Sequence, residues 1–379
     1  MEICQRINLQ KGRKIDMLKN SINCIKNILG YPSRWYIRKK FDVYDMNGYF
    51  KEKQRIDNLE EEYDPLSQDE HSFRKHLDNM EHMRKIAGVI RFDAWEKDKE
   101  RERSELIDAI VHGNKDFPEE YSDEIKYLRK KGDLYIYPYP YTEKYSTLKE
   151  TFTVHKEKRN QYVLHNGKKL FYPYSFSSDE VLENYTQLIT EQDALSPHQY
   201  FSENVNFEKG IFVDVGSAEG IISLDIIEKA DEVYLLERSK EWISALQDTF
   251  KDYMDKIHII PYYAGAFDSD ITITLDTLLS KYVNEDIFVK IDVEGMELEV
   301  LRGCINTFKK NNCKFSCASY HTNTMEKKLC DFFEKSGFCT ETSNGYMLFT
   351  FGYMTMKNGM YEKIEYPYFR KGIVRAYKK

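Results

Sequence analysis

The second half of the chain predicts an α/β fold, a doubly wound Rossmann-like sheet of mostly parallel strands whose last strand is antiparallel. From Gly210 onward, short apolar runs alternate with segments of helical periodicity. The first run, IFVDV at 211–215, is continuously apolar, as is typical of a parallel strand covered by helices on both faces. A turn with two glycines follows this run directly and leads into a helical segment. Together these three observations favour a ligand-binding sheet.

The elements of this half can be assigned in order from apolar runs and periodicity. The expected parallel strands are 211–215, 232–237, 286–293 and 314–320, together with a strand that begins at 256 and whose following loop ends at 266. The expected helices are 222–229, 239–250, 274–282 with Asp276 as its cap, 294–304 and 325–335. Two further strands, near 338–342 and 346–351, are expected to complete the sheet.

The first half predicts a mainly helical extension with a hairpin. Residues 1–130 are rich in charge, and 71–111 show one apolar stripe at helical spacing. Residues 132–173 favour strands and turns, with Asn166 and Gly167 as the turn of a hairpin, and a helix is expected at 178–190. We therefore expect a helical, charged domain at 1–150, a hairpin and connecting helix at 151–204, and a catalytic domain at 205–379.

Composition limits the class of protein. The 379 residues are 41% hydrophobic, and 56 basic against 63 acidic residues give a net charge of −7, which argues against a general nucleic-acid binder. No apolar run is long enough to span a membrane. Charged residues interrupt every apolar stretch near the N-terminus, so we expect no signal peptide there. The seven cysteines form no C-x-x-C pair. These features predict a cytoplasmic protein with reduced thiols and no nucleic-acid partner, and leave a homo-oligomer open.

The glycine turn VDVGSAEG at 213–220 is the first candidate site. Gly216 permits a tight turn, and Gly220 permits a ligand to lie close to the helix that follows. Asp214 stands where a dinucleotide fold has its first glycine, and its carboxylate would repel a pyrophosphate. Glu237 ends the next strand about 20 residues later, a spacing suited to binding ribose hydroxyls. The pattern favours a cationic or zwitterionic ligand that carries adenosine, such as S-adenosylmethionine, over a purely structural turn.

Further motifs follow the turn in a fixed order. They are LLE with Trp242 after it, TLDTLL, KIDVEGMELEVLRG, SYH and GYMLF. With VDVGSAEG, this series resembles the FkbM family of class I S-adenosylmethionine-dependent methyltransferases, many of which O-methylate sugars or natural products. The resemblance extends over about residues 185–379, whereas the first 150 residues resemble no family.

The resemblance implies roles for particular residues. The residues implied in cofactor binding are Asp214, Gly216, Ser217, Glu219 and Gly220 in the turn, Glu237 at the ribose, Trp242, Ala264 and Gly265 around the adenine, and Gln192 and His198 over the methionine end. For Gln192 and His198, a polar connector between a helix and a strand is the alternative.

The catalytic candidates lie after the fourth and fifth strands. His321 is the natural base because it titrates near neutrality, with Asp292 as its rival. Lys290 is a catalytic candidate at an exposed strand end, or only the partner of an acid. Glu294 and Glu297, three apart on one side of a helix, would contact substrate or simply stabilise the helix dipole. Four of these residues could ligate a metal, but no spacing is diagnostic, so none is expected.

The expected function is transfer of a methyl group from S-adenosylmethionine to a hydroxyl of a small-molecule, sugar or glycan acceptor. Four tyrosines, Tyr135, Tyr137, Tyr139 and Tyr141, could stack on sugar rings or simply pack. Two other classes stay open: a nucleotide-dependent oxidoreductase on a similar sheet, and a non-catalytic cofactor-binding or scaffold module.

Overall fold

The computed structural model describes residues 104–113, 116–157, 160–349, 355–357, 360–362 and 368–378. The chain divides into two compact units, and all described residues except 360–361 belong to one of them. Residues 104–111 are helical, as expected, and the rest of the helix predicted at 71–111 lies outside the described residues. The domain boundaries given above remain a prediction.

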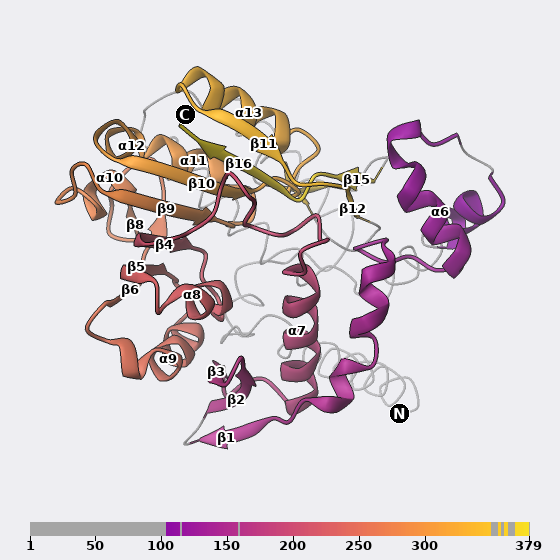
Figure 1. The fold of residues 1–379 in the computed structure, drawn as a ribbon, viewed down its shortest axis with the longest axis horizontal. Coiled ribbons are helices and arrows are strands. Elements are labelled where there is room, and N and C mark those ends of the chain that lie inside the picture. Colours follow the sequence, from indigo (N-terminus) through magenta and orange to yellow (C-terminus); the bar gives the residue numbers. More distant parts are fainter. Residues whose placement is uncertain are drawn as a thin grey trace, which may run out of the picture. The chain divides into compact units, whose positions relative to one another are not determined.

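The centre of this unit is a seven-stranded sheet in the order β11-β16-β10-β9-β4-β5-β6 (Figure 1). Its strands are β4 (Gly210–Val215), β5 (Ala230–Leu236), β6 (Ile257–Ile260), β9 (Asp286–Ile291), β10 (Asn312–Ala318), β11 (Cys339–Thr342) and β16 (Ile373–Tyr377). β16 is antiparallel to both of its neighbours, and the pairs from β10 to β6 are parallel. The first strand of this sheet, β4, lies at its centre; β5 and β6 are added on one side, and the chain then crosses to β9 on the other side. This doubly wound topology confirms the predicted fold class.

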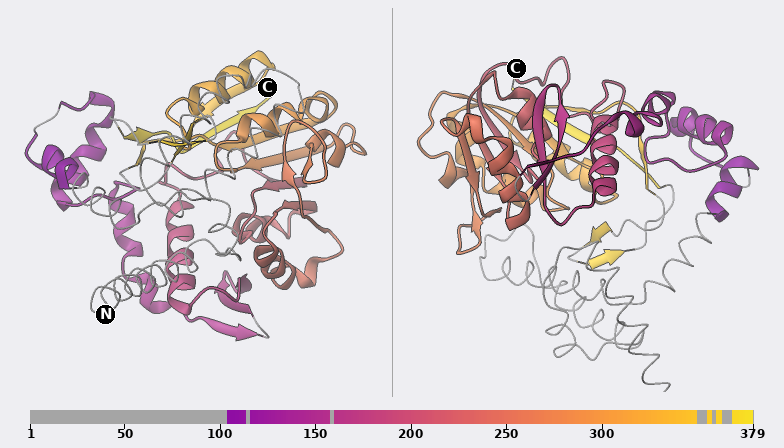
Figure 2. Two further views of the ribbon diagram at one scale, coloured as in Figure 1. Left: turned by 180° about the vertical axis from the view of Figure 1, so that it is seen from behind. Right: turned by 90° about the horizontal axis from the view of Figure 1, so that it is seen from below.

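Helices cover both faces of the sheet (Figures 1 and 2). Within β4, Phe212 belongs to the core on one face and Val213 to the core on the other, and neither side chain is exposed. This double burial explains the continuous apolar run of the strand. The covering helices are α7 (Ser178–Glu191), α8 (Ile221–Ile226) and α9 (Lys240–Thr249) on the Phe212 face, and α10 (Leu275–Leu278), α11 (Glu297–Arg302), α12 (Ile305–Lys310) and α13 (Met325–Lys335) on the other.

The predicted hairpin is confirmed and adds to the same core. β1 (His155–Glu157), β2 (Asn160–His165) and β3 (Lys168–Tyr172) form an antiparallel sheet. Asn166 and Gly167 both have positive φ, as a type I′ turn requires. The hairpin's apolar side chains share a core with α8 and α9, so it buttresses the fold that carries the site.

The last strand of the sheet corrects the sequence assignment. The strand expected near 346–351 is, in the described residues, the short β12 (Met347–Leu348), which pairs with β15 (Phe369–Arg370) outside the main sheet. The antiparallel strand is β16, inserted between β10 and β11. Local pattern marks a strand but not its partner, because pairing joins segments far apart in the sequence.

Asp276 caps a different helix from the one expected. Thr274 is the N-cap of α10, and its hydroxyl accepts from the Thr277 N–H. The Asp276 carboxylate instead accepts from the N–H groups of Asn306 and Thr307 in the first turn of α12. The residue does cap a helix, but one that only the tertiary fold brings near.

The tyrosine-rich segment is not a strand. Residues 134–139 lack regular structure and lead into the 3-10 helix η2 (Pro140–Tyr145). Tyr137 and Tyr141 are buried against Met347 and Phe349, whereas Tyr135 is 41% exposed. Packing therefore accounts for the two buried rings. The remaining short elements are η1 (Glu119–Tyr121), α6 (Ser122–Lys131), η3 (Leu148–Thr151), η4 (Lys251–Tyr253), β7 (Tyr263–Ala264), β8 (Thr272–Ile273), β13 (Thr355–Lys357) and β14 (Met360–Glu362).

Two broader expectations can be compared with the described part of the chain. None of its helices is both long enough and apolar enough to cross a membrane. Five cysteines fall within it, all with free thiols: Cys304, Cys313, Cys317, Cys330 and Cys339.

Candidate active site

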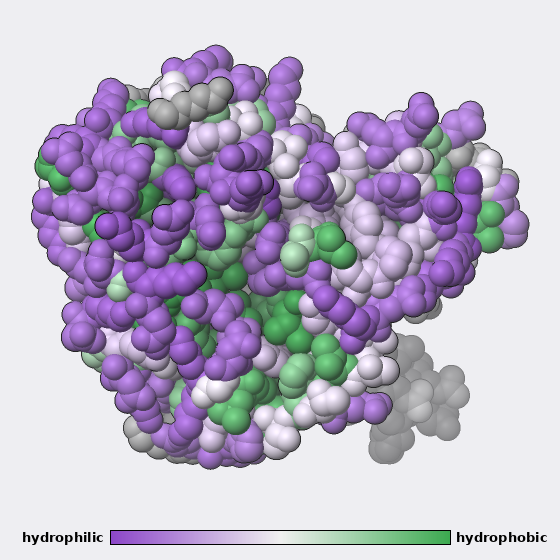
Figure 3. Space-filling view, viewed as in Figure 1, coloured by the Kyte–Doolittle hydropathy of each residue, from purple (hydrophilic) through white to green (hydrophobic). Residues whose placement is uncertain are grey.

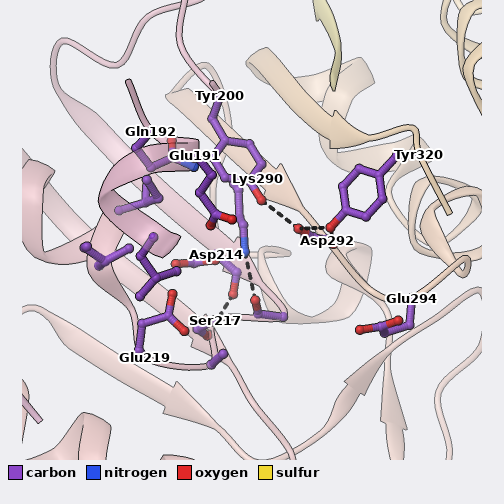
Figure 4. A pocket seen from close by; sticks show the side chains of 15 residues that line it. Glu191, Gln192, Tyr200, Asp214, Ser217, Glu219, Lys290, Asp292, Glu294 and Tyr320 are labelled. Carbon is purple, nitrogen blue, oxygen red and sulfur yellow. Dashed lines mark hydrogen bonds and ion pairs between the residues drawn. The ribbon is translucent and has the colours of Figure 1, made fainter. Parts of the chain in front are cut away.

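A pocket opens at the carboxyl ends of β4 and β9, the edge predicted to bind ligand (Figure 4). In the space-filling view, apolar side chains gather around a hollow in the region between α7 and α8 (Figure 3). Leu188, Ile221 and Ile222 supply apolar lining from these helices. The predicted site residues that the pocket brings together are Gln192, Asp214, Gly216, Ser217, Glu219, Lys290, Asp292 and Glu294.

The glycine turn is fixed by close packing on two sides. Gly216 has φ 77°, and a Cβ there would lie 2.0 Å from the carbonyl oxygen of Asp292. Gly220 also has positive φ, but a Cβ there would meet Leu246 and Phe250 of the core at 2.8 and 3.0 Å. Gly220 was expected to make room for a ligand; instead, the packing of α9 and the residue after it accounts for the glycine.

Asp214 and Lys290 form a buried ion pair between neighbouring strands. They are direct partners in the β4–β9 register, and Lys290 Nζ lies 2.9 Å from Asp214 Oδ1. Nζ also donates to the Gly216 carbonyl at 2.8 Å, and Ser223 Oγ donates to Asp214 Oδ2 at 2.7 Å. Burial alone would lower the pKa of Lys290, but the nearby carboxylates outweigh it and raise that pKa. The expectation of an exposed lysine is wrong: Lys290 is 6% exposed and ties the glycine turn to β9.

Asp292 is surrounded by hydrogen-bond donors. Tyr200 donates to Oδ2 at 2.7 Å, and the Tyr320 hydroxyl lies 3.1 and 3.2 Å from the two oxygens. His198 Nε2 is 3.7 Å from Oδ2, and His321 Nε2 is 3.4 Å from Oδ1. Burial would raise the pKa of Asp292, but His198 and the charge of His321 outweigh it and hold that pKa far below its ordinary value. Asp292 is therefore an anion at neutral pH.

His321 lies between two carboxylates. Its Nδ1 is 2.9 Å from Glu297 Oε1, and its Nε2 faces Asp292. Burial would lower the pKa of His321, but Glu297, then Asp292 and Glu294, raise it to about 9. Glu297 Oε1 is held in place by the N–H groups of Val293 and Gly295, both at 3.2 Å. At neutral pH the imidazole is therefore protonated.

The two glutamates after Asp292 do not share a helix face. α11 begins at Glu297, and Glu294 precedes it in a turn, with φ 56°. Glu297 is completely buried, so the expected contact with substrate is wrong and its neighbour is His321. Glu294 lines the pocket with a side chain that is 73% exposed.

Asp292, Glu297 and His321 also form a group able to hold a metal ion. One ligand atom from each lies within 4.8 Å of the others, which makes this a candidate cluster within the described residues. The raised pKa of His321 means that a proton neutralises these carboxylates when no metal is bound, and a metal would have to displace it.

The expected ribose acid lies beside the glycine turn. Glu237 follows β5, and its carboxylate accepts from the Ala218 N–H at 3.1 Å and the Ser239 N–H at 2.6 Å. Burial raises the pKa of Glu237 despite these bonds. Trp242 packs against Phe176 and Tyr172, with ring centroids 5.5 and 6.0 Å apart. The proposed roles of Glu237 and Trp242 at the adenosine stay predictions.

The other cofactor candidates lie near the pocket or outside its lining. Gln192 lines it and contacts His198, Nε2 to Nδ1, at 3.4 Å. Ala264 and Gly265 are not among the lining residues. The Gly265 carbonyl oxygen packs against Gly303, where an added Cβ would lie only 2.1 Å from it. Their adenine role remains a prediction.

Three of the polar side chains that line the pocket were not predicted. Tyr200 and Tyr320 bind Asp292, and Glu191 lines the pocket from the end of α7. Tyr320 precedes His321, Tyr200 lies two residues after His198, and Glu191 precedes Gln192, so nearness to predicted site residues was the available signal.

Comparison with known proteins gives a family for part of this unit. Residues 268–346 match the family model described as the methyltransferase FkbM domain. This segment is similar to the FkbM methyltransferase domain. The match includes Lys290, Asp292 and His321 and confirms the family resemblance, while the glycine turn precedes the matched segment. Comparison with curated proteins found no match.

Solved structures resemble the chain at low identity. The methyltransferase FkbM from Methylobacillus flagellatus KT is 17% identical, with a TM-score of 0.35, over 53% of this chain and 54% of that one. Precorrin-6y C5,15-methyltransferase from Geobacter metallireducens GS-15 is 15% identical, with a TM-score of 0.31, over 46% and 85%. M. capricolum TrmK, in complex with S-adenosyl-homocysteine, is 11% identical, with a TM-score of 0.30, over 45% and 63%.

Proposed function

We propose that the protein is an S-adenosylmethionine-dependent O-methyltransferase that acts on a hydroxyl of a sugar, glycan or natural-product acceptor. The observation that carries the cofactor is the charge of the pocket. Five carboxyl groups line it, from Glu191, Asp214, Glu219, Asp292 and Glu294, and Lys290 is the one lysine or arginine among its described lining residues. Such a site suits a ligand with positive charge and disfavours a pyrophosphate.

The residues present fit this cofactor. The glycine turn leaves backbone close to the pocket, and Asp214 with Lys290 fixes that turn on the sheet. Leu188, Ile221 and Ile222 offer apolar surface for a nucleoside. When bound, S-adenosylmethionine would supply a methyl group on a sulfonium; an aligned acceptor oxygen would form a bond to that methyl carbon as the carbon–sulfur bond breaks, and S-adenosylhomocysteine would leave.

His321 is our candidate base, and Glu297 is its positioning residue. Glu297 binds Nδ1, so the nitrogen left to accept the acceptor's proton is Nε2, which faces Asp292. The pKa of His321 is about 9, so at neutral pH the imidazole is protonated and must lose this proton before it can act as a base. Asp292, the alternative base, is ionised but its lowered pKa makes it a weak one.

The hydroxyl acceptor and its sugar or natural-product class rest on the family resemblance. A small-molecule or glycan acceptor, a cytoplasmic location and the lack of a nucleic-acid partner are proposals of the same kind. A homo-oligomer stays open.

The test is turnover with purified full-length protein. S-adenosylmethionine is incubated with pooled sugars, glycans and metabolites, and S-adenosylhomocysteine formation and methylated products are followed by mass spectrometry. We expect a product methylated on oxygen, lost in His321→Asn without loss of cofactor binding. Binding of NAD but not of S-adenosylhomocysteine would instead favour an oxidoreductase, and cofactor binding without any product a scaffold.

A further inference from the structure

Two carboxyl groups of the pocket form no ion pair with any described residue. Glu191 ends α7 and Glu219 lies in the glycine turn, and in Figure 4 both carboxyl groups point toward the middle of the pocket. The described lining offers one lysine, and it is bound to Asp214 and to the Gly216 carbonyl. The hydrogen bond given for Glu191 comes from a neutral group, the Tyr137 hydroxyl at 3.2 Å. Within the described part of the chain, neither glutamate thus has an ion-pair partner.

The surroundings favour the neutral form of Glu219 when the pocket is empty. Burial raises the pKa of Glu219 to about 8, and raises that of Glu191 as well. The ionisable groups acting on Glu219 are Glu191 from α7, Asp214 from β4, Lys290 from β9 and, facing it from β3, Tyr172. Those acting on Glu191 are His198, Asp292, Lys290 and Tyr137, with Tyr200 and Tyr320 alongside.

We propose that Glu219, together with Glu191, distinguishes the methyl donor from its product by charge. This inference rests on the proposed S-adenosylmethionine cofactor. The donor carries a positive sulfonium that the product, S-adenosylhomocysteine, lacks. When the donor binds, the glutamate pair releases a proton to solvent, and the resulting carboxylate forms an ion pair with the sulfonium. Product binding leaves the proton in place, so the pocket holds the donor more tightly and releases the product.

Binding must then be linked to protons, with a definite sign. Below about pH 8 the donor has to expel a proton, so its affinity rises with pH and levels off above that value. The product gains nothing from the same ionisation. With a pKa of about 8, the ionised fraction of Glu219 rises from about 3% at pH 6.5 to about 76% at pH 8.5, so we expect the ratio of donor to product affinity to increase roughly 25-fold over this range.

The experiment is isothermal titration calorimetry of the full chain with S-adenosylmethionine and S-adenosylhomocysteine. Runs from pH 6.5 to 8.5, in two buffers of different ionisation enthalpy, give affinities and protons released. The variants are Glu219→Gln, which keeps shape and removes charge, and Glu191→Gln. Glu183→Gln is the matched control, because it lies on α7 with a side chain 77% exposed to solvent. The ligands' own amino groups titrate alike in every variant, so differences between variants report on the glutamates.

The expected result is proton release with the donor only, and a ratio of affinities that becomes independent of pH in Glu219→Gln. Glu191→Gln should reduce the pH dependence, and Glu183→Gln should leave it unchanged. Equal proton release with both ligands, or an unaltered ratio in both pocket variants, would overturn the inference while the cofactor assignment stands. Failure of wild-type protein to bind either ligand would instead overturn the proposed function. If Glu219→Gln does not fold, Glu191→Gln and the wild-type proton counts still decide.

Discussion

The ion pair between His321 and Glu297 makes a quantitative prediction for Glu297→Gln. This change keeps the size of a fully buried side chain and removes the charge 2.9 Å from Nδ1. The pKa of His321 is about 9 against an ordinary 6.5, a difference of about 2.5, to which Glu297 contributes most among the groups that raise it. With Asp292 and Glu294 accounting for the rest, we expect the pKa to fall by about 1 to 2.

The energy involved follows from this fall. Each pKa unit corresponds to about 1.4 kcal/mol, so Glu297 favours the charged imidazole by about 1.4 to 2.8 kcal/mol. If His321 is the base, kcat/KM of wild type rises with pH toward 9, and in Glu297→Gln the rise begins 1 to 2 units lower. The plateau should also be lower, because the amide cannot hold Nδ1–H as the carboxylate does.

Two assays measure the prediction: the pH profile of kcat/KM, and NMR titration of the His321 ring in the same protein. Glu294→Gln is the graded control, since its exposed carboxylate is 4.0 Å from Nε2 and should change the pKa by much less. Circular dichroism checks that each variant is folded. A folded Glu297→Gln protein whose His321 titrates as in wild type would refute the reasoning. An unmoved kinetic profile with a moved NMR titration would remove His321 as the base.

Three further predictions concern stability and metals. Because its pKa is raised, the protonated His321 stabilises the fold fully below pH 6.5, and this stabilisation is lost as the pH rises through about 9. The free energy of unfolding in urea should therefore fall across this pH range. The part of the fall that is due to His321 should be absent in His321→Asn. Asp214→Asn leaves the buried Lys290 without its partner and should cost about 3 kcal/mol, measured by denaturant unfolding; a cost below about 1 kcal/mol would mean that the pair is unimportant. EDTA should leave methyl transfer intact, because a proton already balances the Asp292, Glu297 and His321 group; activity that is lost and then restored by a divalent cation would assign a metal there.

The elements that follow local pattern were predictable. Strands such as β4 and β9 and the turn after β4 were assigned because a doubly buried strand and a glycine turn leave their marks within a few residues. The tyrosine-rich segment misled for the same reason, since its β-prone composition is local while its burial against Met347 and Phe349 is not.

The site shows the same division. The edge of the sheet was predictable, because parallel strands bring their carboxyl ends together, and Asp214, Asp292 and His321 were found on that ground. Their pairing was not: Glu297 was taken for a substrate contact and Lys290 for an exposed group. Tyr200 and Glu191 come from the segment before β4 and lie near predicted site residues in the sequence, but the partners that they meet, Asp292 for Tyr200 and the pocket for Glu191, are set by the fold.

The sequence by itself determined the order of strands and helices, the glycine turn and the acids at strand ends. Each of these features depends on residues that are close to one another in the sequence. The tertiary structure alone decided the charge states. The β4–β9 register pairs Asp214 with Lys290, and the end of β10 sets His321 between Asp292 and Glu297. Burial and the distance between charges set a pKa, and both come from segments that meet only when the chain folds.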